Sequence, residues 1–158
     1  KDIMIQRIQT LYLLGVVVLT TLMMCLPLAE FLCGAETFNL YGYGLRSVAT
    51  GEMYKSTIFL AIMLVATALL PLVNIFLYKR RMTQIRYCIV EFVLLVGSVL
   101  MLALHYFLFY RAFADFDFHA LSIKVTMLLP IAALFLNYLA MKAIAADEAL
   151  VRSVDRIR

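Results

Sequence analysis

Four long apolar stretches, almost free of charged side chains, constrain this chain more than any other feature. They predict membrane spans over residues 8–29, 57–78, 87–110 and 123–142. Glu91 is the only carboxylate within them. A helix rises about 1.5 Å per residue and needs roughly 17–25 apolar residues to cross the hydrocarbon core. The sequence therefore predicts an all-α fold, a single membrane domain of four antiparallel transmembrane helices.

The composition excludes an ordinary soluble domain. Of the 158 residues, 65% are hydrophobic and 15% are charged. Soluble domains are about 45–50% apolar and about 25% charged. A chain of this composition needs the lipid bilayer to cover its apolar surface.

Lys and Arg are distributed unevenly between the two ends of the predicted helices. One side holds Lys1, Arg7, Lys79, Arg80, Arg81, Arg86, Lys142, Arg152, Arg156 and Arg158, and the other holds Arg46, Lys55, Arg111 and Lys124. Because cytoplasmic segments carry the excess of basic residues, we expect both termini and the tail 143–158 inside the cell. The segments 30–56 and 111–122 are then the outer loops. The net charge of +4 reflects this bias and contact with anionic lipid heads, and it does not indicate nucleic acid.

Polar residues recur at one depth on the cytoplasmic side of the predicted bundle. Glu91 lies five residues after Arg86, and the two asparagines each lie five residues before a lysine, so all three are about 7–8 Å inside a basic residue. The predicted layer consists of Glu91, Asn74, Asn137, Thr10, Tyr12 and Arg7. Such residues face the bundle interior or a wet cavity. One interpretation is a clasp that fixes helix register, with Glu91 protonated or paired with an arginine; the other is a pocket for a proton, a cation or a small polar ligand.

The C-terminal tail is predicted to continue as an amphipathic helix. Leu150, Val151, Val154 and Ile157 recur on one face, and Glu148 stands four residues before Arg152. The predicted contact residues are Glu148, Arg152, Asp155 and Arg156. This helix either lies on the membrane surface or docks a membrane-protein partner or a second copy of the chain.

The outer loops carry weaker signals. The stretch around Gly42 and Gly44 predicts a short hairpin. Asp115, Asp117 and His119 alternate and share one face of an extended backbone. They are residue types that bind divalent metals, but interleaved phenylalanines make a wet membrane rim the simpler interpretation.

No catalytic pattern is present. The sequence has no nucleophile with a base, no phosphate-binding glycine loop and no H-E-x-x-H. Its three cysteines form no C-x-x-C pair. We therefore predict a protein that is not an enzyme and that needs no cofactor.

Both ends of the chain resemble those of a known family. The segments MIQRIQTLYLL (4–14) and DEALVRSVDRIR (147–158) are similar to the termini of a four-span bacterial membrane family known as a domain of unknown function, found mainly in Bacteroidota. The resemblance extends over the whole chain in the number of spans. Ala146 departs from the family pattern, in which a lysine often precedes the Asp-Glu pair. The resemblance implies four helices and a place in the bacterial inner membrane, and it implies no activity.

Two functions are compatible with these features. The first is a non-catalytic accessory or assembly subunit that docks through its C-terminal helix. The alternative is a carrier that binds a small molecule, an ion or a lipid in a cytoplasm-facing pocket around Glu91.

Overall fold

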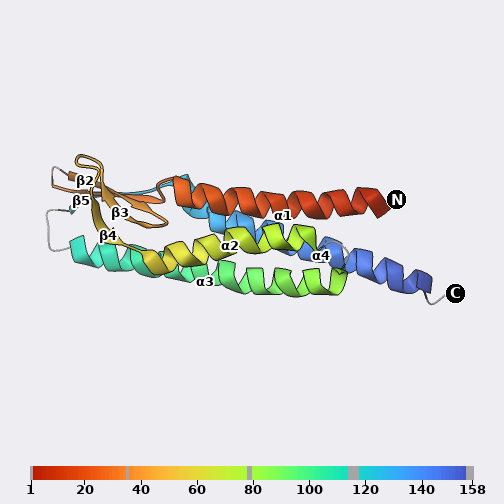
Figure 1. The fold of residues 1–158 in the computed structure, drawn as a ribbon. Coiled ribbons are helices and arrows are strands. Elements are labelled where there is room, and N and C mark those ends of the chain that lie inside the picture. Colours follow the sequence, from red (N-terminus) through yellow and green to blue (C-terminus); the bar gives the residue numbers. More distant parts are fainter. Residues whose placement is uncertain (1, 35, 78–79, 114–117, 156–158) are drawn as a thin grey trace.

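The structure is a computed structural model that describes residues 2–34, 36–77, 80–113 and 118–155. A bundle of long helices carries a β-sheet at one end (Figure 1). The helices are α1 (Asp2–Cys25), α2 (Ile58–Phe76), α3 (Arg81–Phe113) and α4 (Leu129–Asp155), with a 3₁₀ turn, η1 (Val125–Leu128), before α4. The strands are β1 (Ala29–Cys33), β2 (Glu36–Tyr41), β3 (Gly44–Ser47), β4 (Met53–Ser56) and β5 (Phe118–Ile123).

Within the described residues, four helices are long and apolar enough to cross a membrane. They are Ile8–Cys25, Ile58–Phe76, Arg81–Phe113 and Val125–Ser153. Their number and composition indicate a multi-pass membrane protein. The sequence prediction of four spans is confirmed in this sense.

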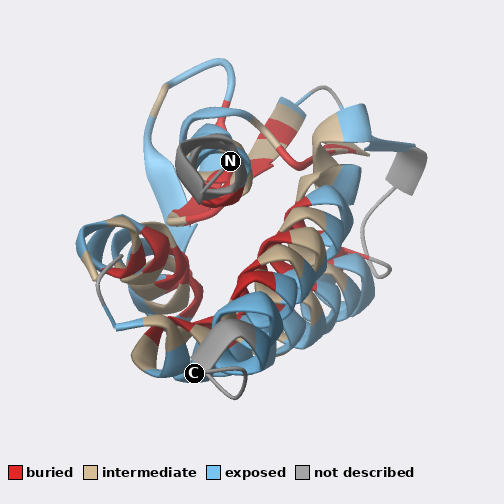
Figure 2. Ribbon diagram, turned by 90° about the vertical axis from the view of Figure 1, so that its right-hand side faces the viewer, coloured by how far each residue is buried: buried red, intermediate tan, exposed pale blue. Residues whose placement is uncertain are grey.

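The four helices pack in a ring. α1 lies between α2 and α4, and α3 lies between the same two helices on the opposite side. Buried residues line the inner faces of the helices, and exposed apolar residues cover the outer faces (Figure 2). This is the arrangement expected where lipid surrounds the bundle, because lipid-facing surfaces need no burial within the protein.

The prediction of a purely all-α fold is wrong. The two segments assigned to outer loops contribute a five-stranded antiparallel sheet with strand order β4-β3-β2-β1-β5. The predicted hairpin is present as β2 and β3, with Tyr41 opposite Gly44. β1, β4 and β5 were not predicted, and β5 in particular pairs with β1, which it follows by more than 80 residues. A pairing between distant segments leaves no local pattern in the sequence.

The sheet packs its apolar face onto the ends of the helices. Phe31 is fully buried, and its ring contacts those of Tyr106, Phe109 and Phe113 on α3. Phe38 on β2 stacks on Phe113 with ring centroids 5.4 Å apart. α3 therefore extends past the other helices as a support for the sheet (Figure 1).

Two helix ends differ from the predicted spans. α1 ends at Cys25 instead of near residue 29, and Pro27, which lacks an N–H, follows two residues later. β1 begins at Ala29. At the other terminus, α4 continues past the predicted span end at residue 142 without a break to Asp155, so the tail is helical as far as that residue.

We predict that Phe31→Ala destabilises the protein by about 3–5 kcal/mol, because it removes a fully buried aromatic ring. Phe59→Ala, at a 68% exposed position on α2, is the matched control and should cost far less. Denaturant unfolding in detergent micelles measures both. Equal losses would show that the sheet is not packed on α3 as described.

Candidate functional site

Two asparagines from different helices converge on Cys88 of α3. The Asn74 side-chain nitrogen, on α2, lies 3.2 Å from the Cys88 Sγ. The Asn137 side-chain nitrogen, on α4, donates to the Cys88 carbonyl oxygen at 2.9 Å. All three residues are buried. These contacts tie α2 and α4 to the same turn of α3, toward the end of the bundle that carries both termini.

Gln84 completes the contact between α2 and α3. Its side-chain nitrogen donates to the Asn74 carbonyl oxygen at 3.0 Å, and the Asn74 side chain donates to the Gln84 carbonyl oxygen at 3.3 Å. The Asn74 carbonyl oxygen, in the last turn of α2, also accepts from the Leu77 amide at 3.1 Å, and Gln84 supplies its second donor. Sequence reasoning missed Gln84, although its position four residues before Cys88 and seven before Glu91 places it on the same helix face.

Glu91 lies one helical turn beyond Cys88 on that face, and it is 2% exposed. Neither of its carboxylate oxygens has a hydrogen-bond partner among the described residues. The side-chain oxygens of Asn74 and Asn137 are likewise buried and unpartnered within the described part of the chain. Both asparagines direct side-chain N–H groups to α3, and this layer presents their oxygens and the Glu91 carboxylate as hydrogen-bond acceptors that are unpartnered in the part of the chain that the structure describes.

The other predicted members of the layer contribute less. Thr10 is exposed, whereas Tyr12 is partly buried and packs against the apolar cluster around Leu13 and Cys88. The side chain of Arg7 lies outside the described residues. The structure therefore brings Asn74 and Asn137 together at Cys88, one helical turn from Glu91, and it adds Gln84.

An ion pair lies at the terminal side of this layer. Arg81 Nε of α3 is 3.1 Å from Asp147 Oδ2 of α4, and the Asp147 side chain is only 3% exposed. The Gln9 side chain of α1 donates to the Ala143 carbonyl oxygen at 3.2 Å. α4 is therefore held to both neighbours past the predicted end of its span at residue 142, and the first part of the predicted tail belongs to the bundle.

Beyond Asp147 the helix is exposed. Arg152 Nε pairs with Glu148 at 2.9 Å and its Nη2 lies 3.4 Å from the Met82 sulfur. Leu150 is 56% exposed and Val151 is 37% exposed. Of the other predicted contact residues, the Asp155 side chain and Arg156 lie outside the described residues.

The outer candidates are not tested by the structure. Asp115, Asp117 and the side chain of His119 lie outside the described residues, although the backbone of His119 belongs to β5. Cys33, at the end of β1, is a free thiol, and burial raises the pKa of that thiol. A raised pKa keeps the thiol protonated and unreactive near neutral pH.

A comparison with known protein families identifies the family to which this chain is related. Residues 5–157 match the model described as Domain of unknown function (DUF4293). The chain belongs to the DUF4293 family. No curated protein matches it. Membership covers nearly the whole chain, and the family description assigns no activity.

We predict that a double-mutant cycle on Arg81 and Asp147 gives a larger coupling free energy than one on Glu148 and Arg152. The first pair is almost buried, whereas exposed i, i+4 pairs contribute about 0.3–0.5 kcal/mol. Thermodynamic unfolding of alanine variants measures both couplings. A coupling for Arg81 and Asp147 no larger than that of the exposed pair would contradict the described packing of α4.

Proposed function

We propose that this DUF4293 protein is a non-catalytic integral protein of a bacterial inner membrane that binds a proton or a small cation at Glu91. The excess of Lys and Arg supports a cytoplasmic position for both termini. The Glu91 layer then lies in the cytoplasmic half of the bundle. The role is that of a small carrier or of an ion-responsive membrane subunit.

The unpartnered carboxylate carries this proposal. A charge buried without a partner is costly, so a carboxylate at this depth needs a bound proton or a positive charge. The oxygens of Asn74 and Asn137 add further acceptors near the same turn of α3. A layer with several buried, unpartnered acceptors is complementary to a ligand that is a hydrogen-bond donor or a cation.

The same contacts weigh against a role for Glu91 in a structural clasp. Asn74, Gln84 and Asn137 link α2, α3 and α4 through bonds that do not involve Glu91. Interhelical bonds of this kind contribute about 0.6 kcal/mol each on average. The clasp is therefore complete with these residues, and Glu91 is free to bind a proton or a cation.

We predict that at least one of Na⁺, K⁺, methylammonium and H⁺ raises the unfolding temperature of the wild type but not of Glu91→Gln. A ligand that binds only the folded state at about 100 times its Kd stabilises it by about 2.7 kcal/mol. The measurement is thermal unfolding in lipid nanodiscs across salts and pH.

Glu36→Gln is the matched control, since Glu36 is an exposed carboxylate on β2. This variant should respond to every ion as the wild type does. If Glu91→Gln also responds as the wild type does, Glu91 binds none of these ions and the proposal is wrong.

A second candidate function rests on the exposed end of α4. Leu150, Val151 and the neighbouring Met82 of α3 form an exposed apolar surface past the ion pair of Arg81 and Asp147. Such a surface suits an accessory or assembly subunit that docks a membrane-protein partner. Its charged neighbours, Glu148 and Arg152, suit a protein contact better than lipid alone.

We predict that full-length protein captures a partner in mild detergent and that deletion of residues 149–158 abolishes this capture. The deletion must begin after Glu148, because removing Asp147 would leave Arg81 without its buried partner. The paired variant Leu150→Ser with Val151→Ser should reproduce the loss in a full-length chain. Identical sets of captured proteins for all forms would exclude docking through α4.

A further inference from the structure

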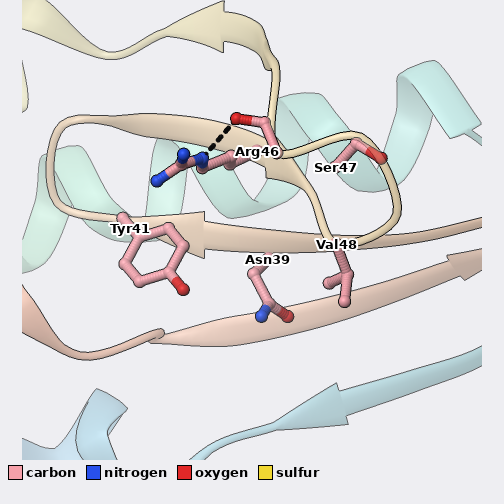
Figure 3. Close-up of a pocket in the computed structure, with 6 residues that line it drawn as sticks. Asn39, Tyr41, Arg46, Ser47 and Val48 are labelled. Carbon is pink, nitrogen blue, oxygen red and sulfur yellow. Dashed lines mark hydrogen bonds between the residues drawn. The ribbon is translucent and has the colours of Figure 1, made fainter.

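The outward face of the sheet contains a small polar pocket that the functions proposed above do not use. It has a volume of about 220 Å³. Its lining residues are Asn39, Tyr41, Arg46, Ser47, Val48 and Gly51 (Figure 3). Asn39 and Arg46 are paired positions on β2 and β3, so their side chains lie on the same face of the sheet.

The pocket combines the guanidinium cation of Arg46 with an unpartnered hydrogen-bond acceptor, the side-chain oxygen of Asn39. Arg46 donates through Nε to the Gly51 carbonyl oxygen, which leaves its terminal nitrogens for another partner. Among the described residues, Arg46 has no ion pair. Asn39 Oδ1 is buried and has no hydrogen-bond partner within the described chain. A matching ligand therefore carries an anionic group and a nearby hydrogen-bond donor.

The loop that bounds the pocket is fixed by its own hydrogen bonds. The Ser47 amide donates to the Glu52 carbonyl oxygen and the Gly51 amide donates to the Ser47 carbonyl oxygen, both at 3.0 Å. The Thr50 amide also lies 3.4 Å from Ser47 Oγ. The guanidinium of Arg46 is thereby held in place before any ligand arrives, which lowers the entropic cost of binding.

The hairpin that carries the pocket reaches the ends of two candidate spans. The turn between β2 and β3 contacts the outer ends of two spans, because a Cβ on Gly42 would lie 2.6 Å from Leu64 of α2 and 3.3 Å from the Met23 carbonyl oxygen of α1. Tyr41, which lines the pocket, and Tyr43 flank this turn with their rings stacked 5.3 Å apart. Tyrosines gather at the level of lipid head groups.

We propose that this pocket binds the head group of a phospholipid from the adjacent leaflet. The phosphate contacts the guanidinium of Arg46, and the ammonium or hydroxyl group of the head group donates to Asn39 Oδ1. Arg pairs with phosphate through charge-assisted hydrogen bonds in a planar geometry. A volume of about 220 Å³ holds several water molecules, so it admits a head group while the acyl chains stay in the bilayer.

The test is a titration of the full chain in detergent micelles, followed by native mass spectrometry. The probes are dihexanoyl-phosphatidylethanolamine and its water-soluble head group, phosphoethanolamine. We expect the lipid to bind and Arg46→Gln to weaken its binding about tenfold or more, since hydrogen bonds to charged groups contribute about 1.5–3 kcal/mol. Asn39→Ala should weaken it by a smaller factor.

Lys55→Gln is the matched control for charge, because Lys55 is an exposed cation on β4, and Thr37→Ala is the control for Asn39 on the same strand. Both should bind the lipid as the wild type does, and unfolding temperatures should confirm that all four variants fold. Equal weakening by Arg46→Gln and Lys55→Gln would overturn the proposal. Binding of phosphoethanolamine as tight as that of the lipid would instead assign the pocket to a free phosphate ester.

Discussion

Every backbone N–H and C=O group inside the hydrocarbon core must find its partner within the protein, and the rest of this structure depends on that constraint. Helices satisfy it segment by segment, so each apolar stretch folds as one. Lipid is as apolar as the side chains, so the hydrophobic effect contributes little to helix association in the membrane. Close packing and a few buried polar contacts must fix how the four helices fit together.

Cys88 is the centre of those contacts. Asn74 and Asn137 approach it from opposite neighbours of α3, and Gln84 joins the same turn to the end of α2. Glu91 lies one turn further into the bundle without a partner of its own in the described chain. This unpartnered carboxylate is the feature on which the proposed binding of a proton or a cation depends.

The two ends of the bundle satisfy their polar groups differently. At the end that carries the termini, α3 and α4 extend as helices and pair Arg81 with Asp147. At the other end, β1 lies between β2 and β5 and connects the segment after α1 to the segment before η1 and α4. The salt bridge of Lys124 with Glu30, at 2.7 Å, joins the same two segments. The sheet thereby fixes the helix ends on its side of the bundle and holds the Arg46 pocket beside them.

The sequence alone predicted the four candidate spans and a common depth for Glu91, Asn74 and Asn137, because hydropathy and helical rise are local properties of the chain. The hairpin of β2 and β3 was also predictable, since its turn carries Gly42 and Gly44 in a short stretch. Only the tertiary structure decided that β1 pairs with β5, that both asparagines contact Cys88, and that Asp147 is buried beside Arg81. Each of these joins residues that are distant in the chain, and their partners are set by helix rotation and strand register. A one-dimensional pattern gives the depth of a side chain in the membrane, but not the neighbour that it faces.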